Sequence, residues 1–137
     1  MGISTIQLER ELTAWFAARL GMTVDLDIFR GGIPDGRGEA ICVMLGSERR
    51  DGTIDPKYRL QVLGKFQDRD AAAEKRDALC SAVNAIGVYG VDIGTYVVCV
   101  TRESDVSMPF RQPDGGRVVF GVSANYVVSV KIKSQQS

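Results

Sequence analysis

The chain has 137 residues, of which 45% are hydrophobic and 25% charged, as in an ordinary globular domain. Its 17 lysines and arginines balance 17 aspartates and glutamates, which argues against a strongly basic nucleic-acid-binding protein. Histidine is absent, so Ser-His-Asp and Cys-His catalytic sets and histidine-ligated metals are excluded. No run approaches the roughly 18 apolar residues of a membrane-spanning helix, and the start lacks a secretory signal pattern. We therefore expect one domain over residues 1–137 and no membrane partner.

The first segment with helical periodicity runs from Ser4 to Leu20. Its apolar residues recur on one stripe that we expect to face the core: Leu8, Leu12, Trp15, Phe16 and Leu20. Ser4 and Gln7 predict a capping box at the start, and Gly21 predicts the C-terminal cap.

Three strands are predicted to follow this helix. Val24 to Phe29 alternates between apolar and polar residues, which is typical of a half-buried strand. Ala40 to Gly46 is a continuous apolar run and predicts a strand covered on both faces. Lys57 to Phe66 alternates again, and the polar segment Ser47 to Pro56 joins it to the preceding strand as a hairpin.

A second helix is predicted after the third strand. Asp68 or Asp70 caps its start, alanines recur along it, and it ends near Ile86, before Gly87. The acidic residues at its start complement the positive end of the helix dipole.

Two further strands are predicted near the C-terminus. Tyr96 to Glu103 forms the fourth strand, and Ser104 to Gly116, with two prolines, is expected to be a long loop. Arg117 to Lys133 alternates without a break and would span about 55 Å as one straight strand. It must therefore bend or project past its domain, and it would leave an unpaired edge open to another subunit.

Together these elements predict an α+β fold in the order α-β-β-β-α-β-β. Hairpin-like spacing between most strands favours a mainly antiparallel sheet of about five strands with both helices packed on it.

Residues with catalytic potential are few. The glycine-rich segment from Gly31 to Gly38 lacks the ending of a phosphate-binding loop and leads into a strand, so a turn is favoured. Asp25 and Asp27 would share one strand face and could pair for acid–base or metal chemistry, although solvated acids on a strand are commoner. Cys42, Cys80 and Cys99 lie in apolar stretches and are interpreted as small core residues. We assign no catalytic, cofactor-binding or metal-binding residue, and we expect no enzyme activity and no cofactor.

The loops carry the residues that favour assembly. Arg49 and Arg50, beside Lys57 and Arg59, form the densest basic patch, which could contact nucleic acid or an acidic partner. Long loops in a compact domain are usually functional. The candidate interface residues are Ile33, Pro34, Arg49, Arg50, Asp51, Asp55, Met108 and Phe110.

The chain resembles the tail terminator proteins of long-tailed bacteriophages, also called tail-completion or minor capsid proteins. The resemblance rests on the opening helix with its tryptophan, on DIFRGGIPDGRGEAICVML, on GSERRDGTIDPKYRLQVLGKF, and on QDRDAAAEKRDALCSAV followed by a terminal hairpin. The turn at Pro34 and Asp35 and the helix start at Asp68 and Asp70 are its best single points. The segment Ser104 to Gly116 departs from the family pattern.

The resemblance implies a non-enzymatic structural protein of the virion tail or neck, assembled in the host cytoplasm. Members of this family form hexameric rings that cap the tail tube, end tube polymerisation and dock the tail to the head-completion proteins. The implied partners are further copies of the chain, the tail tube protein and a head-completion or connector protein, with DNA only passing through the channel. Another head–tail connector or neck component is the closest alternative. A small α+β ligand-binding or enzyme domain, using Asp25, Asp27 and the glycine-rich segment, is the alternative from a different class.

Overall fold

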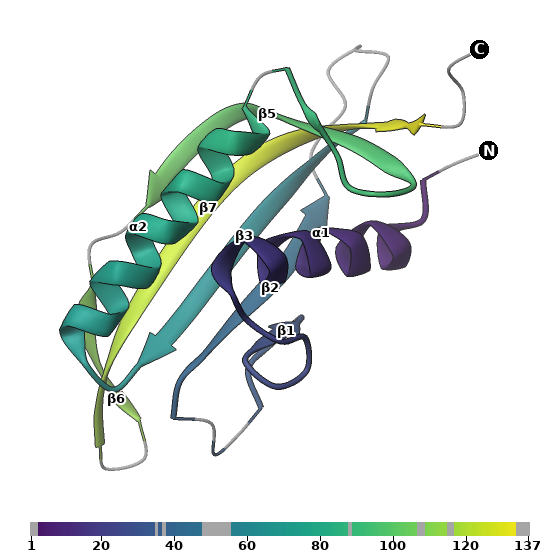
Figure 1. The fold of residues 1–137 in the computed structure, drawn as a ribbon. Helices are drawn as coiled ribbons and strands as arrows, with labels where there is room; N and C mark the ends of the chain where they lie inside the picture. Colours follow the sequence, from purple (N-terminus) through teal and green to yellow (C-terminus); the bar gives the residue numbers. More distant parts are fainter. Residues whose placement is uncertain are drawn as a thin grey trace.

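The structure is a computed structural model, which describes residues 3–34, 36, 38–47, 56–87, 89–106, 109–114 and 117–133. Figure 1 shows a curved sheet with two helices lying across it. In chain order the elements are α1 (Thr5–Leu20), β1 (Ile28–Arg30), β2 (Ala40–Ser47), β3 (Lys57–Phe66), α2 (Arg69–Ile86), β4 (Val91–Asp92), β5 (Tyr96–Val106), β6 (Phe110–Asp114) and β7 (Arg117–Ile132).

The sheet has the strand order β1-β2-β3-β7-β5-β4, and β6 also pairs with β7. Neighbouring strands run antiparallel except β1 and β2, which are parallel. The α+β class, the mainly antiparallel sheet and the order α-β-β-β-α-β-β are therefore confirmed. Two of the described strands, β4 and β6, were not predicted, because strands this short carry little periodicity.

Both helices pack on the same face of the sheet and enclose the main core. Alternate residues of each strand point toward the helices, because side chains in a strand project to opposite faces in turn. The largest fully buried side chains in this core are Phe16, Leu8, Leu12, Ile28, Leu60, Leu79 and Ile86. Gly64 leaves space on this face for the ring of Phe66, since a Cβ added at Gly64 would lie 2.7 Å from Phe66 Cε2.

Helix α1 has the predicted boundaries, with a modified N-terminal cap. The Ser4 hydroxyl oxygen accepts a hydrogen bond from the Gln7 backbone N–H at 3.2 Å, as a capping residue should. The Gln7 side chain donates instead to Glu11, so the reciprocal half of the expected box is not formed. Gly21 ends the helix in the left-handed conformation, with φ of 66°.

Helix α2 begins at the first of the two predicted caps. An Asp68 carboxylate oxygen accepts a hydrogen bond from the Ala71 N–H at 2.9 Å, while Asp70 lies inside the first turn. Both acids therefore sit where the helix dipole stabilises negative charge.

The strand predicted from Val24 to Phe29 is wrong in its first half. The backbone N–H groups of Leu26 and Asp27 both donate to the Thr23 carbonyl oxygen, which closes a turn. Asp25 adopts a φ of 66° within this turn, and Leu26 is 53% exposed. The alternation of side chains that suggested a strand therefore belongs to a turn, and β1 begins only at Ile28.

The long loop predicted from Ser104 to Gly116 is also wrong. Strand β5 continues to Val106, and β6 occupies Phe110–Asp114. Proline in a polar segment favours a loop, but Pro113 pairs with Val118 on the sheet edge, where a missing N–H is tolerated. The structure around the prolines is thus set by pairing with β7 and not by the local sequence.

The last strand is paired along most of both edges, although its pairing with β3 does not extend to Arg117–Val119. β3 pairs with one edge of β7 from Phe120 to Ser129, and β5 and β6 pair in succession with the other edge. The length of β7 is accommodated by curvature of the whole sheet, which Figure 1 shows clearly.

Candidate assembly surface

The hairpin formed by β6 and β7 presents two exposed apolar side chains. Phe110 is 42% exposed and Val118 is 49% exposed. Phe110 pairs with Gly121 and Val118 pairs with Pro113, so the two side chains project from opposite faces of the hairpin. β3 stops pairing with β7 at Phe120, and Figure 1 shows the hairpin extending past the N-terminal end of α2. Val118 lies near the tip of the hairpin, whereas Phe110 lies at its base, where its partner Gly121 also pairs with Lys65 of β3. The hairpin therefore offers one exposed apolar side chain on each face, at different distances from its tip.

The second candidate surface is the face of the sheet opposite the two helices, which no described helix covers. We call this face the open sheet face. Its described residues on the two central strands are Lys57, Arg59, Gln61, Leu63 and Lys65 of β3, and Val119, Gly121, Ser123, Asn125, Val127, Ser129 and Lys131 of β7.

Apolar residues gather at the β1–β2 side of the open sheet face. Phe29, Ala40 and Cys42 form a small buried cluster there, and they are packed by the half-buried side chains of Ile33, Met44 and Leu63. Ile33, one of the candidate interface residues, therefore covers part of this cluster, while Pro34 beside it is exposed.

The other candidate interface residues are divided between described and undescribed parts of the chain. Phe110 lies on the hairpin and is exposed. Arg49, Arg50, Asp51, Asp55 and Met108 lie outside the described residues. The structure thus places Ile33 and Phe110 on separate elements and does not test the charged hairpin between β2 and β3.

Asp25 and Asp27 do not form the strand pair that a catalytic role would need. Both belong to the turn before β1, and Oδ2 of Asp27 accepts a hydrogen bond from the Thr23 N–H at 3.2 Å. Asp27 therefore has a structural role in its own turn. Within the described ranges, no group of three or more Cys, Asp and Glu side chains is arranged to hold a metal ion.

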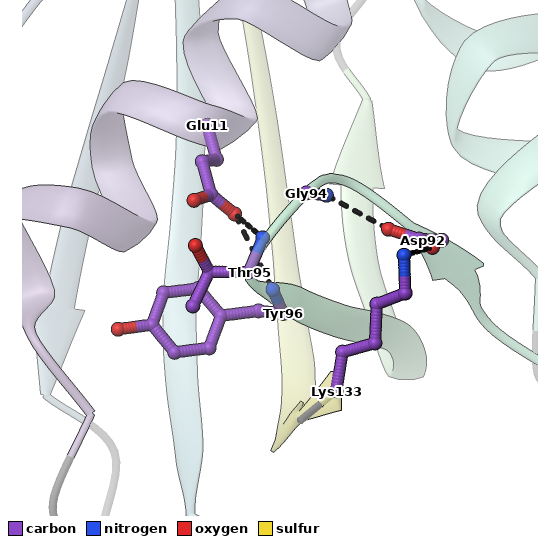
Figure 2. Close-up of polar contacts among 6 residues, drawn as sticks. All are labelled: Glu11, Asp92, Gly94, Thr95, Tyr96 and Lys133. Carbon is purple, nitrogen blue, oxygen red and sulfur yellow. Dashed lines mark hydrogen bonds and ion pairs between the residues drawn. The ribbon is translucent and has the colours of Figure 1, made fainter. Parts of the chain in front are cut away.

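The polar cluster that the sequence did not reveal lies between α1 and the turn before β5 (Figure 2). Oε1 of Glu11 accepts hydrogen bonds from the backbone N–H groups of Thr95 and Tyr96, at 2.8 and 3.3 Å. Oε2 accepts another from Nε2 of Gln7 at 2.8 Å. Burial by itself would raise the pKa of Glu11, but these hydrogen bonds together lower it. Residues 84 or more positions apart meet here, so no spacing rule could have found the cluster.

The same turn is also held from the C-terminal end of β7. Nζ of Lys133 forms an ion pair with Asp92, whose other carboxylate oxygen accepts from the Gly94 N–H at 2.9 Å. The backbone N–H of Lys133 donates to the carbonyl oxygen of Thr95 at 2.9 Å. These contacts lower the pKa of Asp92. The contacts in Figure 2 therefore join α1, β4, the start of β5 and the C-terminal end of β7, and their role is structural.

The cysteines are free thiols at different depths. Cys42 is buried, and burial raises the pKa of its thiol despite an opposing hydrogen bond with the backbone of Leu63. Cys80 and Cys99 are half-buried. A raised pKa leaves less thiolate at neutral pH, so Cys42 is a packing residue and not an activated nucleophile.

Comparison with protein-family models and with curated proteins finds no match to this chain. Among the described helices, none is both long enough and apolar enough to cross a membrane.

Proposed function

We propose that this chain is a structural protein of a phage tail, a tail terminator whose copies form a ring, six subunits in the family it resembles. The ring caps the finished tail tube, ends its polymerisation and docks the tail to the head-completion protein. DNA passes through the ring without being its ligand. The function requires no catalytic residue and no cofactor.

The observation that carries the proposal is the β6–β7 hairpin, which exposes one apolar side chain on each face, Phe110 at its base and Val118 near its tip. Phe110 and Val118 lie on opposite faces of one projecting hairpin, each more than 40% exposed. Burying one such side chain against a partner contributes about 1.5–3 kcal/mol. Because the hairpin is already paired along β7, little further ordering would offset that gain. A preformed apolar arm of this kind suits a protein that docks onto neighbours in an assembly.

The order and packing of the helices and strands also support the proposal, less specifically than the hairpin does. The order α-β-β-β-α-β-β, with both helices on one face of a curved sheet, agrees with the family that the sequence resembles. The sheet also has a face without a described helix, on which Arg59 and Lys131 are exposed while Val119, Val127 and Ser129 are buried. The exposed part of this face is where other copies or other virion proteins could make contact. A head–tail connector of similar fold remains the nearest alternative within the same class.

The experiment that tests this function is native mass spectrometry of the purified chain at micromolar concentration, with negative-stain electron microscopy of the same sample. We expect a closed oligomer and ring-shaped particles. A clean monomer at every concentration up to about 100 μM, well above the ~1 μM range of ordinary specific association, would contradict the proposal.

A second test uses the virus. In a phage that encodes this chain, deletion of its gene should give overlong tail tubes that are not joined to heads, as seen by electron microscopy. Normal tail length in the deletion strain would contradict a terminator role, and normal-length tails without heads would favour the connector alternative.

A further inference from the structure

We infer that the turn between β4 and β5 is a latch whose contacts with the two ends of the fold form and break together. One contact comes from Glu11 in α1, and the other comes from Lys133, directly after β7. We define the latch as residues 92–95, from the last residue of β4 to the residue before β5. When it opens, the start of α1 and the end of β7 are released in one step.

The two contacts meet on a single peptide unit, the one between Thr95 and Tyr96 (Figure 2). The backbone N–H of Tyr96 donates to Oε1 of Glu11 at 3.3 Å. The carbonyl oxygen of Thr95 accepts from the backbone N–H of Lys133 at 2.9 Å. Hydrogen bonds that continue through a shared peptide unit polarise one another, so each is stronger while the other is present. Loss of either contact therefore weakens the other.

The start of α1 is bound to this turn at two further points. Oε1 of Glu11 also accepts from the backbone N–H of Thr95 at 2.8 Å. The backbone N–H of Ser4, the capping residue of α1, donates to the hydroxyl oxygen of Tyr96 at 3.0 Å. The first two turns of α1 and the start of β5 are therefore held together through the same pair of residues.

The end of β7 is bound to the turn through both backbone and side chain. Nζ of Lys133 forms an ion pair with Asp92, and Asp92 accepts from the Gly94 N–H at 2.9 Å. Both charged side chains are about half exposed, so solvent screens their attraction. The backbone hydrogen bond from Lys133 to Thr95 is therefore the contact through which the end of β7 is coupled to Glu11.

Gly94 allows the Glu11 carboxylate to approach the turn. Its φ of 133° lies in a region that side chains disfavour, and an added Cβ would lie 3.1 Å from Oε1 of Glu11. A side chain at position 94 would therefore strain the turn and displace the carboxylate. This gives a second way to open the latch, without changing the charge of Glu11.

The latch can open while the core stays folded. Its hydrogen bonds lie at exposed or partly buried positions. Val98 and Val130 pair with each other two residues further along β5 and β7, and both are fully buried. Surface hydrogen bonds open at a lower free energy than packed apolar segments of the same strands. The latch therefore defines a local opening that precedes global unfolding.

The alternative is that the two ends of the chain open independently, as chain ends commonly do. In that case the amide of Lys133 would exchange its hydrogen through local fraying of β7, at a rate that does not depend on Glu11. The shared peptide unit between Thr95 and Tyr96 favours the coupled opening. The two cases differ in one measurable quantity, the exchange rate of the Lys133 amide in a variant of Glu11.

The test is hydrogen exchange of the full chain, read at single amides by NMR spectroscopy. The variants are Glu11→Gln, which weakens the acceptor, and Gly94→Ala, which displaces it. The matched controls are Glu74→Gln, at an exposed position of α2, and Gly32→Ala, where a Cβ would meet no atom within 4 Å. Amides of the β6–β7 hairpin, at the opposite end of β7, are the internal reference. Circular dichroism confirms that each variant is folded.

In Glu11→Gln the amides of Thr95, Tyr96 and Lys133 should exchange faster together, by about fivefold, as expected for weakening of a charge-assisted hydrogen bond. Gly94→Ala should accelerate the same three amides. The hairpin amides should keep their parent rates in both variants, and all these rates should be unchanged in the two controls. Because exchange is read within each chain, these results do not depend on whether copies form a ring.

Three outcomes would overturn the latch. Faster exchange at Thr95 and Tyr96 with an unchanged rate at Lys133 would show that the two ends open independently. An equal acceleration of the latch and hairpin amides would show a general loss of stability without a local opening. Unchanged rates at all three amides in both variants would show that Glu11 does not hold the turn closed.

Discussion

The backbone N–H of Thr95 donates a 2.8 Å hydrogen bond to the Glu11 carboxylate, although 84 residues separate the two in the chain. The contact joins the middle of α1 to the turn that starts β5, and Figure 2 shows Tyr96 and Lys133 reaching the same turn. Because the N-terminal helix, the turn and the last strand meet here, we expect the stability of the whole domain to depend on Glu11.

Glu11→Gln should destabilise the fold by about 1 kcal/mol, because a charge-assisted acceptor is replaced by a neutral one at a partly exposed site. This corresponds to a decrease of roughly 4 °C in melting temperature for a domain of this size. Calorimetry of both proteins at pH 7 measures the change. Glu74→Gln, at an exposed position on α2, is the matched control and should melt like the parent chain. An equal decrease in both variants would contradict the role given to Glu11.

The contribution of Glu11 should also depend on pH. Its pKa in the folded protein lies below the ordinary value of 4.5, so the folded state favours the ionised form. The stabilisation is therefore fully present above about pH 4.5 and is lost as the pH falls through the folded-state pKa. Chemical unfolding of the parent chain and of Glu11→Gln between pH 7 and pH 3 should give free energies of unfolding that converge toward the acid end. A gap that widens in acid would reverse the assigned sign.

Gly64→Ala should destabilise the core by about 1–3 kcal/mol, since the new Cβ would lie 2.7 Å from the ring of Phe66 and force it to move. Gly46 on the neighbouring strand is the matched control, because a Cβ there would meet nothing closer than 3.7 Å. Urea unfolding of both variants tests the difference. Equal stability of the two would show that the Phe66 ring repacks freely.

Phe110→Ser should leave the melting temperature of the isolated chain within about 2 °C of the parent value, because the side chain is 42% exposed on the hairpin. It should impair assembly or docking if the hairpin binds a neighbour. Phe16→Ser is the matched control, and it should lower the free energy of unfolding by about 3–5 kcal/mol because Phe16 is fully buried. A large loss of stability in Phe110→Ser would place Phe110 in the core and remove the main support for the docking hairpin.

Cys42 should be the last thiol to react with iodoacetamide under native conditions. Its side chain is buried and its thiol pKa is raised, whereas Cys80 and Cys99 are half-buried. Peptide mass spectrometry after timed alkylation ranks the three residues, and alkylation in urea should remove the ranking. Early labelling of Cys42 in the native protein would show that the cluster around Phe29 opens readily.

The sequence-based prediction was accurate where periodicity is long and capping residues are clear. The strand at Lys57–Phe66 has the boundaries predicted for it, and α1 and α2 begin and end within one or two residues of their predicted limits. These segments are decided by local physics, because an amphipathic pattern and a cap specify an element before it packs. The exposure of Phe110 was expected for a similar reason, since a large apolar side chain in a polar segment is visible in the sequence, and its contact with a partner stays a prediction.

The prediction failed where backbone bonding competes with the side-chain pattern. Val24, Leu26 and Ile28 alternate like a strand, but the carbonyl of Thr23 accepts from the following N–H groups and closes a turn there. The segment that contains Pro113 looks like a loop by composition, yet pairing with β7 holds it as an edge strand.

By itself, the sequence determined the helices, the principal strands and their order, because these depend on contacts within a few residues of one another. Only the tertiary structure decided the rest: the central position of β7 in the sheet, the Glu11–Thr95 contact, and the pairing of Phe110 with Gly121. Those features join residues well separated in the chain, and their energies arise only when separate segments pack together, so no local pattern records them.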